Sequence, residues 1–391
     1  MFSFSIHARD KSSKARTGSF ETPHGMVQTP ELAIVATEGV IKSVPKEIYH
    51  ELSLKYAIVN TFHILTKDIL KPIEDAGGIH TYAKMNDVIL ASDSGGFQVF
   101  SLGFGKAHQV GKVGGFFPGK ELESTDENNP ISIDSQGVEF SFDRKPVRLN
   151  PAISMDIQHR IGADIIFAFD ECTSPLNTKD YTKKALARTH AWILDCIQAH
   201  AGHENRQALF AIVQGGFFKD LREESASYMA ALDVPGFGIG GSLGKTKDDM
   251  YDILSWTIPL LPDNKPRHLL GIGQVRDIFE AVERGVDLFD CVIPTREARH
   301  KVLYTKNGKI AVRKMRQVHT VFEAHCDCPA CKTGVTYAQL AALFTEHHPD
   351  AFYYASVHNI AFFGRLMKEI RESITRGSFH TLKAEYLSFY P

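Results

Sequence analysis

The sequence has neither a long hydrophobic segment nor a strong net charge. No uninterrupted apolar stretch approaches the roughly 20 residues that a membrane-spanning helix needs. Residues 1–16, MFSFSIHARDKSSKAR, also lack the apolar core of a signal peptide. We therefore expect a cytoplasmic protein. The formal net charge of -2 does not mark the chain as a whole as a nucleic-acid-binding protein.

Cysteine is scarce, with six in 391 residues, and this excludes a dense disulfide framework. Three of the six, Cys326, Cys328 and Cys331, form a C-x-C-x-x-C cluster. Three thiolates on one turn can hold a tetrahedral ion, and His358 in the following segment YYASVHNIAFF is the candidate fourth ligand. The pattern predicts one structural zinc ion per chain. The alternative is three reduced thiols beside a core histidine.

Length and composition are those of a globular protein with one large domain and an appendage, since 43% of residues are hydrophobic and 23% are charged. We expect a catalytic domain over residues 1–300. Residues 301–391 are expected to form a zinc-binding subdomain and C-terminal helices that pack on it. Residues 296–316 hold eight Lys or Arg against one Glu, so a partner with phosphates can bind there despite the small net charge.

Eight short apolar runs recur along the chain, and seven of them end in a polar residue or a glycine. Stretches with helical periodicity, such as KKALARTHAWILDCIQAH and VRDIFEAVERG, separate most of them. Strands that are apolar on both faces and alternate with helices indicate a parallel sheet, and eight of them predict a (β/α)8 TIM barrel of the α/β class rather than an open doubly wound sheet. The runs are LAIVAT (32–37), YAIVNT (56–61), VILASD (88–93), DIIFAFD (164–170), LFAIVQGG (209–216), GFGIGGS (236–242), HLLGIG (268–273) and LFDCVI (288–293).

The residues that end these runs are candidates for an active site, because barrel active sites form where the strands end. For any single aspartate, a helix cap or a loop turn is the ordinary explanation. Three carboxylates and a carboxamide at one rim, with glycine turns between them, exceed what capping requires. The candidates are Asp93, Asp170, Gln214, Gly241, Gly271 and Asp290.

Asp290 is unusual because it lies inside an otherwise apolar run, in the segment LFDCVIPTREAR. A carboxylate at that depth is costly unless it is paired or used. Two arginines, Arg296 and Arg299, follow shortly after. The segment therefore contains either a structural ion pair or a functional site.

Motifs over nearly the whole chain resemble those of the tRNA-guanine transglycosylases, the queuine tRNA-ribosyltransferase family, in its bacterial form. The resemblance implies a homodimeric barrel enzyme with a zinc-binding subdomain. It also implies the exchange of guanine at the wobble position of tRNAs with a G-U-N anticodon for a 7-deazaguanine, either queuine or 7-aminomethyl-7-deazaguanine. The motifs are NTFHIL (60–65), DSGGFQVFSL (93–102), AFDEC (168–172), IVQGG (212–216), GIGG (238–241), LLGIG (269–273), FDCVIPTREAR (289–299), CDCPAC (326–331) and VHNIAFF (357–363).

The resemblance also implies a role for each candidate. Asp290 would be the nucleophile that forms a covalent ribosyl intermediate, and Asp93 the general acid and base. Asp170 and Gln214 would read the purine edge. The remaining implied contacts are Gly241, Ser242 and Gly271 with the substrate, Phe97 stacked on the base, and Arg296 and Arg299 with the RNA.

Two segments depart from the family pattern. After the paired glycines the sequence reads Ser242-Leu243-Gly244-Lys245, one residue shorter than the common bacterial pattern and without its glutamate. Because Gly244 has no side chain and Lys245 replaces an acid, we expect queuine to be accepted. Residues 102–136 form a longer segment than usual, which covers the site, touches RNA or is an inert surface excursion.

Three other classes of function fit parts of the sequence. A related transglycosylase could act on DNA instead of tRNA. A barrel N-glycoside hydrolase would also use two carboxylates, but it would not need a Cys3His subdomain beside a basic stretch. A non-catalytic subunit that only binds tRNA would not need both Asp93 and Asp290.

Overall fold

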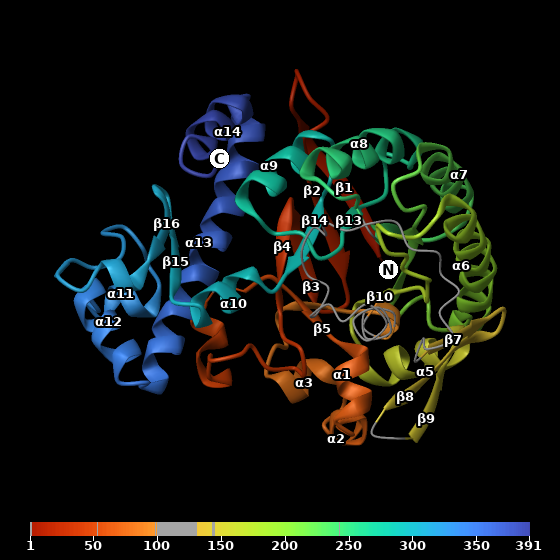
Figure 1. The fold of residues 1–391 in the computed structure, drawn as a ribbon, viewed down its shortest axis with the longest axis horizontal. Helices are drawn as coiled ribbons and strands as arrows, with labels where there is room; N and C mark the ends of the chain where they lie inside the picture. Colours follow the sequence, from red (N-terminus) through yellow and green to blue (C-terminus); the bar gives the residue numbers. More distant parts are fainter. Residues whose placement is uncertain (1, 53, 98, 100–130, 143–144, 242) are drawn as a thin grey trace.

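A computed structural model describes residues 2–52, 54–97, 99, 131–142, 145–241 and 243–391. Its centre is a closed barrel of eight parallel strands, surrounded by helices (Figure 1). All eight apolar runs form barrel strands, so the predicted (β/α)8 architecture is confirmed. In barrel order the strands are β10 (Ile165–Phe167), β11 (Ala208–Val213), β12 (Gly236–Ile239), β13 (Arg267–Leu269), β14 (Leu288–Cys291), β4 (Glu31–Val35), β5 (Tyr56–Val59) and β6 (Ile89–Ser92).

Helices alternate with these strands, and the two stretches predicted from periodicity, KKALARTHAWILDCIQAH and VRDIFEAVERG, correspond to α6 and α9. No described helix has the length and apolar character needed to cross a membrane. The helices up to the last barrel strand are η1 (Lys46–Leu52), α1 (Thr61–Thr66), α2 (Leu70–Asp75), α3 (Ile79–Ala83), α5 (Pro151–Ile161), α6 (Lys179–His200), α7 (Lys219–Ala230), α8 (Lys247–Thr257), η2 (Ile258–Leu260) and α9 (Val275–Glu283).

The interior of the barrel is filled by large side chains opposite small ones. Phe167 and Phe210 meet edge to face, with ring centroids 5.7 Å apart. Gly236 makes room for this pair, because a β-carbon built there would lie 2.4 Å from the Phe210 ring. Alternating large and small residues is how a barrel of this size becomes a packed core rather than a pore.

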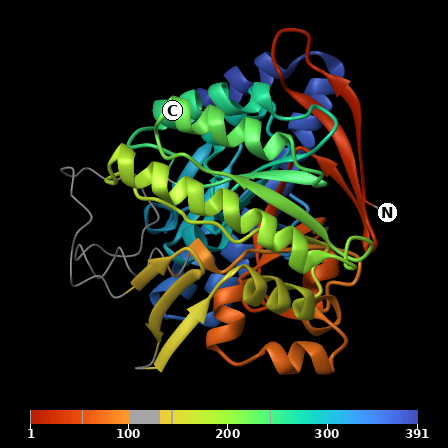
Figure 2. The same cartoon turned by 90° about the vertical axis from the view of Figure 1, so that its right-hand side faces the viewer.

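Two small antiparallel sheets flank the barrel on opposite sides (Figure 2). Phe20 of the first sheet meets Phe210 of the barrel at 5.8 Å, and Phe140 of the second packs on Phe62 at 5.9 Å. The sequence analysis did not predict either sheet. The strands are β1 (Ser3–Arg9), β2 (Arg16–Thr22) and β3 (Gly25–Thr29) in the first, and β7 (Ile131–Asp134), β8 (Gly137–Phe142) and β9 (Lys145–Leu149) in the second.

The C-terminal elements gather along one side of the barrel, where the long helix α13 runs (Figure 1). Helix α13 contacts barrel strand β4, helix α10 and the β15–β16 hairpin. Pro349 at its first turn and Gly377 in the left-handed conformation after its last turn define its ends. The elements are α10 (Ile293–Arg299), β15 (Val302–Thr305), β16 (Gly308–Ala311), η3 (Val312–Lys314), α11 (Pro329–Lys332), α12 (Tyr337–Thr345), α13 (Pro349–Arg376) and α14 (Phe379–Leu387).

Candidate active site and metal centre

The six candidates from the strand ends lie on six neighbouring barrel strands, from β6 through β10, β11, β12 and β13 to β14. Because the strands are parallel, their carboxyl ends meet at one rim of the barrel. Asp93 and Gln214 directly follow β6 and β11, Gly241 and Gly271 lie two residues beyond β12 and β13, Asp170 lies three residues beyond β10, and Asp290 is the third residue of β14.

The carboxylate of Asp290 is held through one of its oxygens. Oδ1 forms a hydrogen bond with Nε2 of His268 at 3.1 Å and accepts another from the N–H of Gly271 at 3.0 Å. In the part of the chain that the structure describes, Oδ2 has no hydrogen-bond partner. The Asp290 side chain is 15% exposed, whereas that of His268 is fully buried. One oxygen of Asp290 is therefore available to a ligand at the rim.

The carboxylate of Asp93 is fixed by the start of helix α1. Its Oδ2 accepts a hydrogen bond from Nδ2 of Asn60 at 2.5 Å, and its Oδ1 accepts bonds from the N–H groups of Thr61 at 2.9 Å and Gly95 at 3.2 Å. Asn60 also caps α1 by accepting a bond from the N–H of His63. The motif NTFHIL therefore orients Asp93, although 33 residues separate it from Asn60.

Asp170 and Gln214 form a buried pair between two neighbouring strands. Nε2 of Gln214 donates to Oδ2 of Asp170 at 2.6 Å. Burial raises the pKa of Asp170 to about 6, although hydrogen bonds from Gln214 and Ser94 act in the opposite direction. A carboxylate that is costly to ionise gains by accepting hydrogen bonds from a ligand. A pKa near neutrality in a polar rim is typical of a functional site.

The carboxamide oxygen of Gln214 is buried and lacks a hydrogen-bond partner among the described residues. The loop around it is fixed, because the buried Arg222 donates to the carbonyls of Val213 at 3.0 Å and Gly216 at 2.7 Å. Gly241 packs so closely that a β-carbon there would lie 2.0 Å from Oε1 of Gln214. A buried, rigid acceptor without a donor indicates that a ligand supplies the donor.

The remaining substrate candidates differ in what the structure says of them. Phe97 is 46% exposed, which is high for a phenylalanine and leaves its ring open to a planar ligand. Ser242 lies outside the described residues, as does most of the long segment 102–136, of which only the last part is seen, beginning strand β7.

The loop after Gly241 departs from the sequence-based interpretation at one position. Gly244 has a positive φ, and a β-carbon there would lie 2.1 Å from the β-carbon of Asp249. Asp249 accepts hydrogen bonds from the N–H groups of Lys245 and Thr246 at the start of α8. A glycine is therefore required at position 244, because any side chain there would clash with the Asp249 cap of α8. Its absence of a side chain does not create room for a ligand.

Arg296 and Arg299 lie in the last turn of the short helix α10, immediately after β14. Burial lowers the pKa of Arg299, and the neighbouring charge of Arg296 lowers it further. Nη1 of Arg299 is buried with no hydrogen-bond partner in the described part of the chain. Two like charges held together with an unpaired donor favour an anionic ligand.

The four predicted metal ligands meet in one cluster. The Sγ atoms of Cys326, Cys328 and Cys331 lie 3.7, 3.7 and 3.6 Å from Nδ1 of His358. Metal–sulfur and metal–nitrogen bonds of about 2.3 and 2.0 Å at a tetrahedral angle give edges of about 3.6 Å between the two ligand atoms. The cluster fits a tetrahedral metal ion.

The surroundings of His358 support the same conclusion. Nε2 of His358 donates to the carbonyl of Tyr304 at 2.9 Å, which leaves Nδ1 without a proton and directed at the three sulfurs. The next residue, Asn359, donates to the carbonyls of Pro294 and Val302 and accepts a bond from the N–H of Tyr304. The metal-binding helix is thereby tied to helix α10.

A second group of potential ligands, His24, His80 and Asp164, lies at the opposite end of the barrel. The two imidazole rings are stacked, with centroids 3.5 Å apart and planes 13° apart. Nitrogens of nearly parallel rings point in parallel directions, whereas the ligands of one ion must converge. Each ring instead forms a hydrogen bond with one oxygen of Asp164, so we interpret this group as structural.

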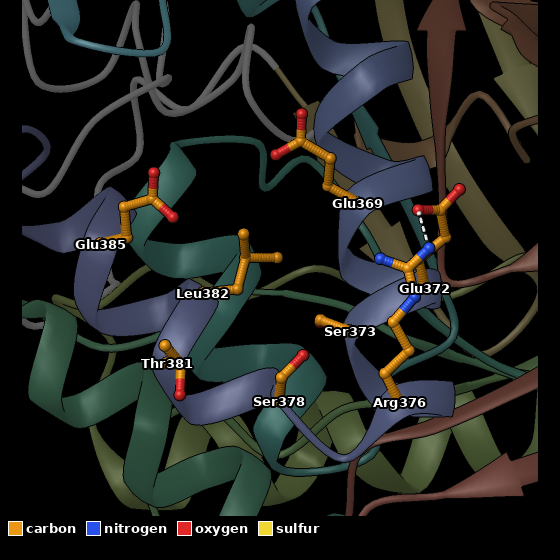
Figure 3. Close-up of a pocket in the computed structure, with 8 residues that line it drawn as sticks. All are labelled: Glu369, Glu372, Ser373, Arg376, Ser378, Thr381, Leu382 and Glu385. Carbon is orange, nitrogen blue, oxygen red and sulfur yellow. Dashed lines mark hydrogen bonds and ion pairs between the residues drawn. The ribbon is translucent and has the colours of Figure 1, made fainter.

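A hollow of about 260 Å³ between α13 and α14 lies outside the candidate site (Figure 3). None of the predicted site residues lines it. Its wall is mostly polar and exposed, and Arg376 and Glu372 pair with each other across one side. The hollow therefore gives no indication of catalytic chemistry. It is lined by Glu369, Glu372, Ser373, Arg376, Ser378, Thr381, Leu382 and Glu385.

The sequence analysis missed three residues that shape the site. Asn60 lies in a quoted motif but was not singled out, and His268 begins the run HLLGIG as its one strongly polar member. Arg222 appeared to be an ordinary charge on an amphipathic helix. The available signals were a polar residue inside an apolar strand for His268 and a polar residue at a strand end for Asn60.

Comparison with known proteins identifies the family. The family model described as Queuine tRNA-ribosyltransferase matches residues 10–391. A relative from Archaeoglobus fulgidus is 43% identical over 96% of this chain and 97% of its own length. The queuine tRNA-ribosyltransferases of Herpetosiphon aurantiacus and Protochlamydia amoebophila are 39% and 38% identical, over 99% and 95% of this chain and 93% and 95% of their own lengths. The chain belongs to the queuine tRNA-ribosyltransferase family, which is a family of pentosyltransferases.

Proposed function

We propose that the chain exchanges guanine at the wobble position of tRNAs with a G-U-N anticodon for a 7-deazaguanine, through a covalent intermediate on Asp290. The single observation that carries this proposal is the asymmetry of the Asp290 carboxylate. Oδ1 is held at 3.0 and 3.1 Å while Oδ2 is available at a partly exposed rim. A fixed carboxylate with one available oxygen is suited to attack an anomeric carbon.

The reaction has two displacements. Oδ2 of Asp290 attacks C1′ of the ribose, the bond from C1′ to guanine breaks, and guanine leaves with a proton from Asp93. The incoming base then gives its proton to Asp93 and attacks C1′, and the bond to Asp290 breaks. Two inversions at C1′ give net retention. The hydrogen bonds of Asp93 with Asn60 and Thr61 support its role by fixing its orientation.

Base recognition is assigned to the buried pair and its neighbours. We propose that Asp170 accepts hydrogen bonds from the purine edge and that the unpaired oxygen of Gln214 accepts another. Gly241 and Ser242 would offer backbone contacts, and Phe97 would stack on the ring. The N–H of Gly271 is used by Asp290, and open space above its α-carbon leaves room for the substrate.

The RNA contacts are assigned to Arg296 and Arg299, with the basic stretch up to residue 316 extending them. Their position in α10, the helix that follows β14, supports this assignment, because β14 carries the proposed nucleophile. The family resemblance further supports action in the cytoplasm as a homodimer.

The metal is proposed to be zinc with a structural role. Four protein ligands fill a tetrahedral shell, so bound zinc would stabilise the subdomain without contacting the reacting atoms. Elemental analysis of protein purified without added metal should find about one zinc per chain. Cys328→Ala should lose the metal and lower the melting temperature. A metal-free Cys328→Ala protein of unchanged stability and activity would contradict the assignment.

The incoming base is proposed to be queuine, in line with the altered loop after Gly241. Gly244 no longer supports this choice, because its shape serves the cap of α8. The remaining support is Lys245, an exposed cation where the bacterial pattern has a glutamate that would attract the cationic aminomethyl group. Exchange with the aminomethyl base and none with queuine would overturn this choice and leave the catalytic roles intact.

Exchange of labelled guanine tests the overall function. A tRNA with a G-U-N anticodon that carries labelled guanine at the wobble position should lose the label when unlabelled base is added. A tRNA with another anticodon serves as the control. Release of label from duplex DNA would favour the DNA transglycosylase, release without base would favour the hydrolase, and binding without release would favour the non-catalytic subunit.

A further inference from the structure

A chain of three polar side chains, of which Tyr56 and His268 are fully buried, crosses the interior of the barrel and ends at the proposed nucleophile Asp290. The hydroxyl of Tyr56 lies 3.1 Å from Nδ1 of His268, and Nε2 of His268 lies 3.1 Å from Oδ1 of Asp290. Tyr56 comes from β5 and His268 from β13, and β14 and β4 lie between these strands in the barrel. The contact therefore spans the lumen rather than joining adjacent strands.

The environment of Tyr56 and His268 is dry and favours one direction for both hydrogen bonds. Tyr56 is 1% exposed, His268 is 0% exposed, and the Phe167 ring meets His268 edge to face at 5.2 Å. Burial raises the pKa of Tyr56 well above 10, and the charges of Asp290 and Asp164 raise it further, so its hydroxyl stays protonated. In the tautomer that satisfies both contacts, the phenol donates to Nδ1 of His268, and Nε2 carries the proton that it donates to Asp290.

We propose that Tyr56 and His268 are positioning residues that hold Oδ1 of Asp290, direct Oδ2 to the anomeric carbon and favour release of the ribose from the covalent intermediate. This inference rests on the proposed function of Asp290. With the Gly271 N–H, His268 gives Oδ1 two donors and leaves Oδ2 for the new bond.

The hydrogen bond from His268 affects the two displacements differently, because the charge of Asp290 changes during the reaction. In the first displacement the carboxylate becomes a neutral ester as the bond from Oδ2 to C1′ forms. In the second, the incoming base bonds to C1′, the electron pair of the C1′–Oδ2 bond returns to Asp290, and the full negative charge reappears. A hydrogen bond to a charged acceptor is about twice as strong as one to a neutral acceptor. The donor from His268 therefore stabilises the departing carboxylate more than the ester.

The test follows the covalent adduct directly. Wild-type protein is mixed with a G-U-N tRNA without free base, the denaturation-resistant adduct is quantified, and its decay is timed after excess guanine is added. Guanine as the incoming base makes the result independent of the preference for queuine. Absence of any wild-type adduct would overturn the proposed function itself, whereas wild-type adduct with unaffected variants would overturn only this inference.

Three variants separate positioning from a structural role. His268→Leu removes the donor, Tyr56→Phe removes only the hydroxyl that fixes the tautomer, and His268→Gln restores a donor near the position of Nε2. Adduct decay should slow on the order of 10-fold or more in His268→Leu, less in Tyr56→Phe and least in His268→Gln. The KM for tRNA should stay unchanged. Tyr228→Phe on the outer helix α7, whose hydroxyl donates to the carbonyl of His190, is the matched control.

Two results would overturn the inference. One is an adduct decay in Tyr56→Phe and His268→Leu that equals that of wild type. The other is equal slowing in all variants, His268→Gln and Tyr228→Phe included, which would indicate a general loss of structure. If His268→Leu fails to fold, Tyr56→Phe carries the test, because it preserves the volume of the side chain.

Discussion

Two aspartates lie at opposite ends of the same barrel strand, β10, and their pKa values are shifted in opposite directions. Asp164 precedes β10 and accepts hydrogen bonds from His24 at 2.8 Å, His80 at 2.9 Å and the N–H of Leu90 at 3.0 Å. Burial alone would raise its pKa, but these donors, with His80 first among them, keep it below the ordinary value of 3.8. Asp170 follows β10, and burial raises its pKa to about 6.

The same contrast separates the two ends of the barrel. At the amino end, the fully buried Asp287 accepts bonds from Arg16 at 2.6 and 2.8 Å and from the N–H of Arg267 at 2.9 Å. At the carboxyl end, Asp290 keeps one oxygen for a ligand. The saturated carboxylates of Asp164 and Asp287 stabilise the amino end of the barrel, whereas Asp290 keeps an oxygen with which it can contact a substrate. This agrees with the general division of labour in TIM barrels.

After the proposed nucleophile Asp290, the largest effect is expected at Asp93. Asp93→Asn keeps an oxygen for the N–H groups of Thr61 and Gly95 but cannot transfer a proton, so base exchange should fall about 10²- to 10⁴-fold. Asp164→Asn at the opposite end is the matched control, and it should lower stability while the folded fraction keeps its rate. Steady-state exchange assays check both. Equal loss of the exchange rate in Asp93→Asn and Asp164→Asn would contradict the assignment of catalysis to the carboxyl end of the barrel and of stability to the amino end.

The next effect concerns stability. Asp287→Asn should lower the free energy of unfolding by about 3–5 kcal/mol, because it removes the buried charged partner of the fully buried Arg16 and leaves only the exposed Asp263 to pair with it. Asp75→Asn, which removes the partner of Lys71 in an exposed ion pair, should change it by less than about 1 kcal/mol. Denaturant titration measures both. A loss below about 1 kcal/mol for Asp287→Asn would contradict the conclusion that buried carboxylates at the amino end of the barrel stabilise the fold.

The smallest effect is a pH dependence at Asp170. Only its ionised form accepts hydrogen bonds from the purine edge with both oxygens, so kcat/KM for the incoming base should rise about tenfold from one unit below to one unit above the pKa of about 6. Asp170→Asn should be slower and should lack this rise. A wild-type profile that is flat through pH 6 would contradict the assignment.

The pKa shifts of Asp170 and Asp164 also predict the direction in which the stability of the fold changes with pH. Because the folded-state pKa of Asp170 lies above its ordinary value of 3.8, stability from this group is present below about pH 4 and is lost as the pH rises through about 6. Asp164 behaves in the opposite way. Because its pKa is lowered in the folded state, its contribution to stability is present above the ordinary pKa of 3.8 and is lost as the pH falls below that value.

The sequence predicted the barrel because its strands are buried on both faces and therefore appear as continuous apolar runs. Strand β11, ALFAIV, is buried at every position. Strand β1, SFSIHAR, alternates between exposed and partly buried residues and has no such run, so the first small sheet was missed. Candidate site residues were predicted where strand ends and motifs coincided. Contacts between distant segments, such as that of Tyr56 with His268, leave no local pattern, because 212 residues separate the partners.

Capture of the covalent intermediate tests the central claim most directly. Wild-type protein incubated with a G-U-N tRNA in the absence of free base should form a denaturation-resistant protein–RNA adduct, and peptide mapping should place the ribose on Asp290. Asp290→Asn should still bind the tRNA but form no adduct, and its exchange rate should fall on the order of 10⁴-fold or more. An adduct on another residue, or exchange by Asp290→Asn at an appreciable fraction of the wild-type rate, would contradict the account.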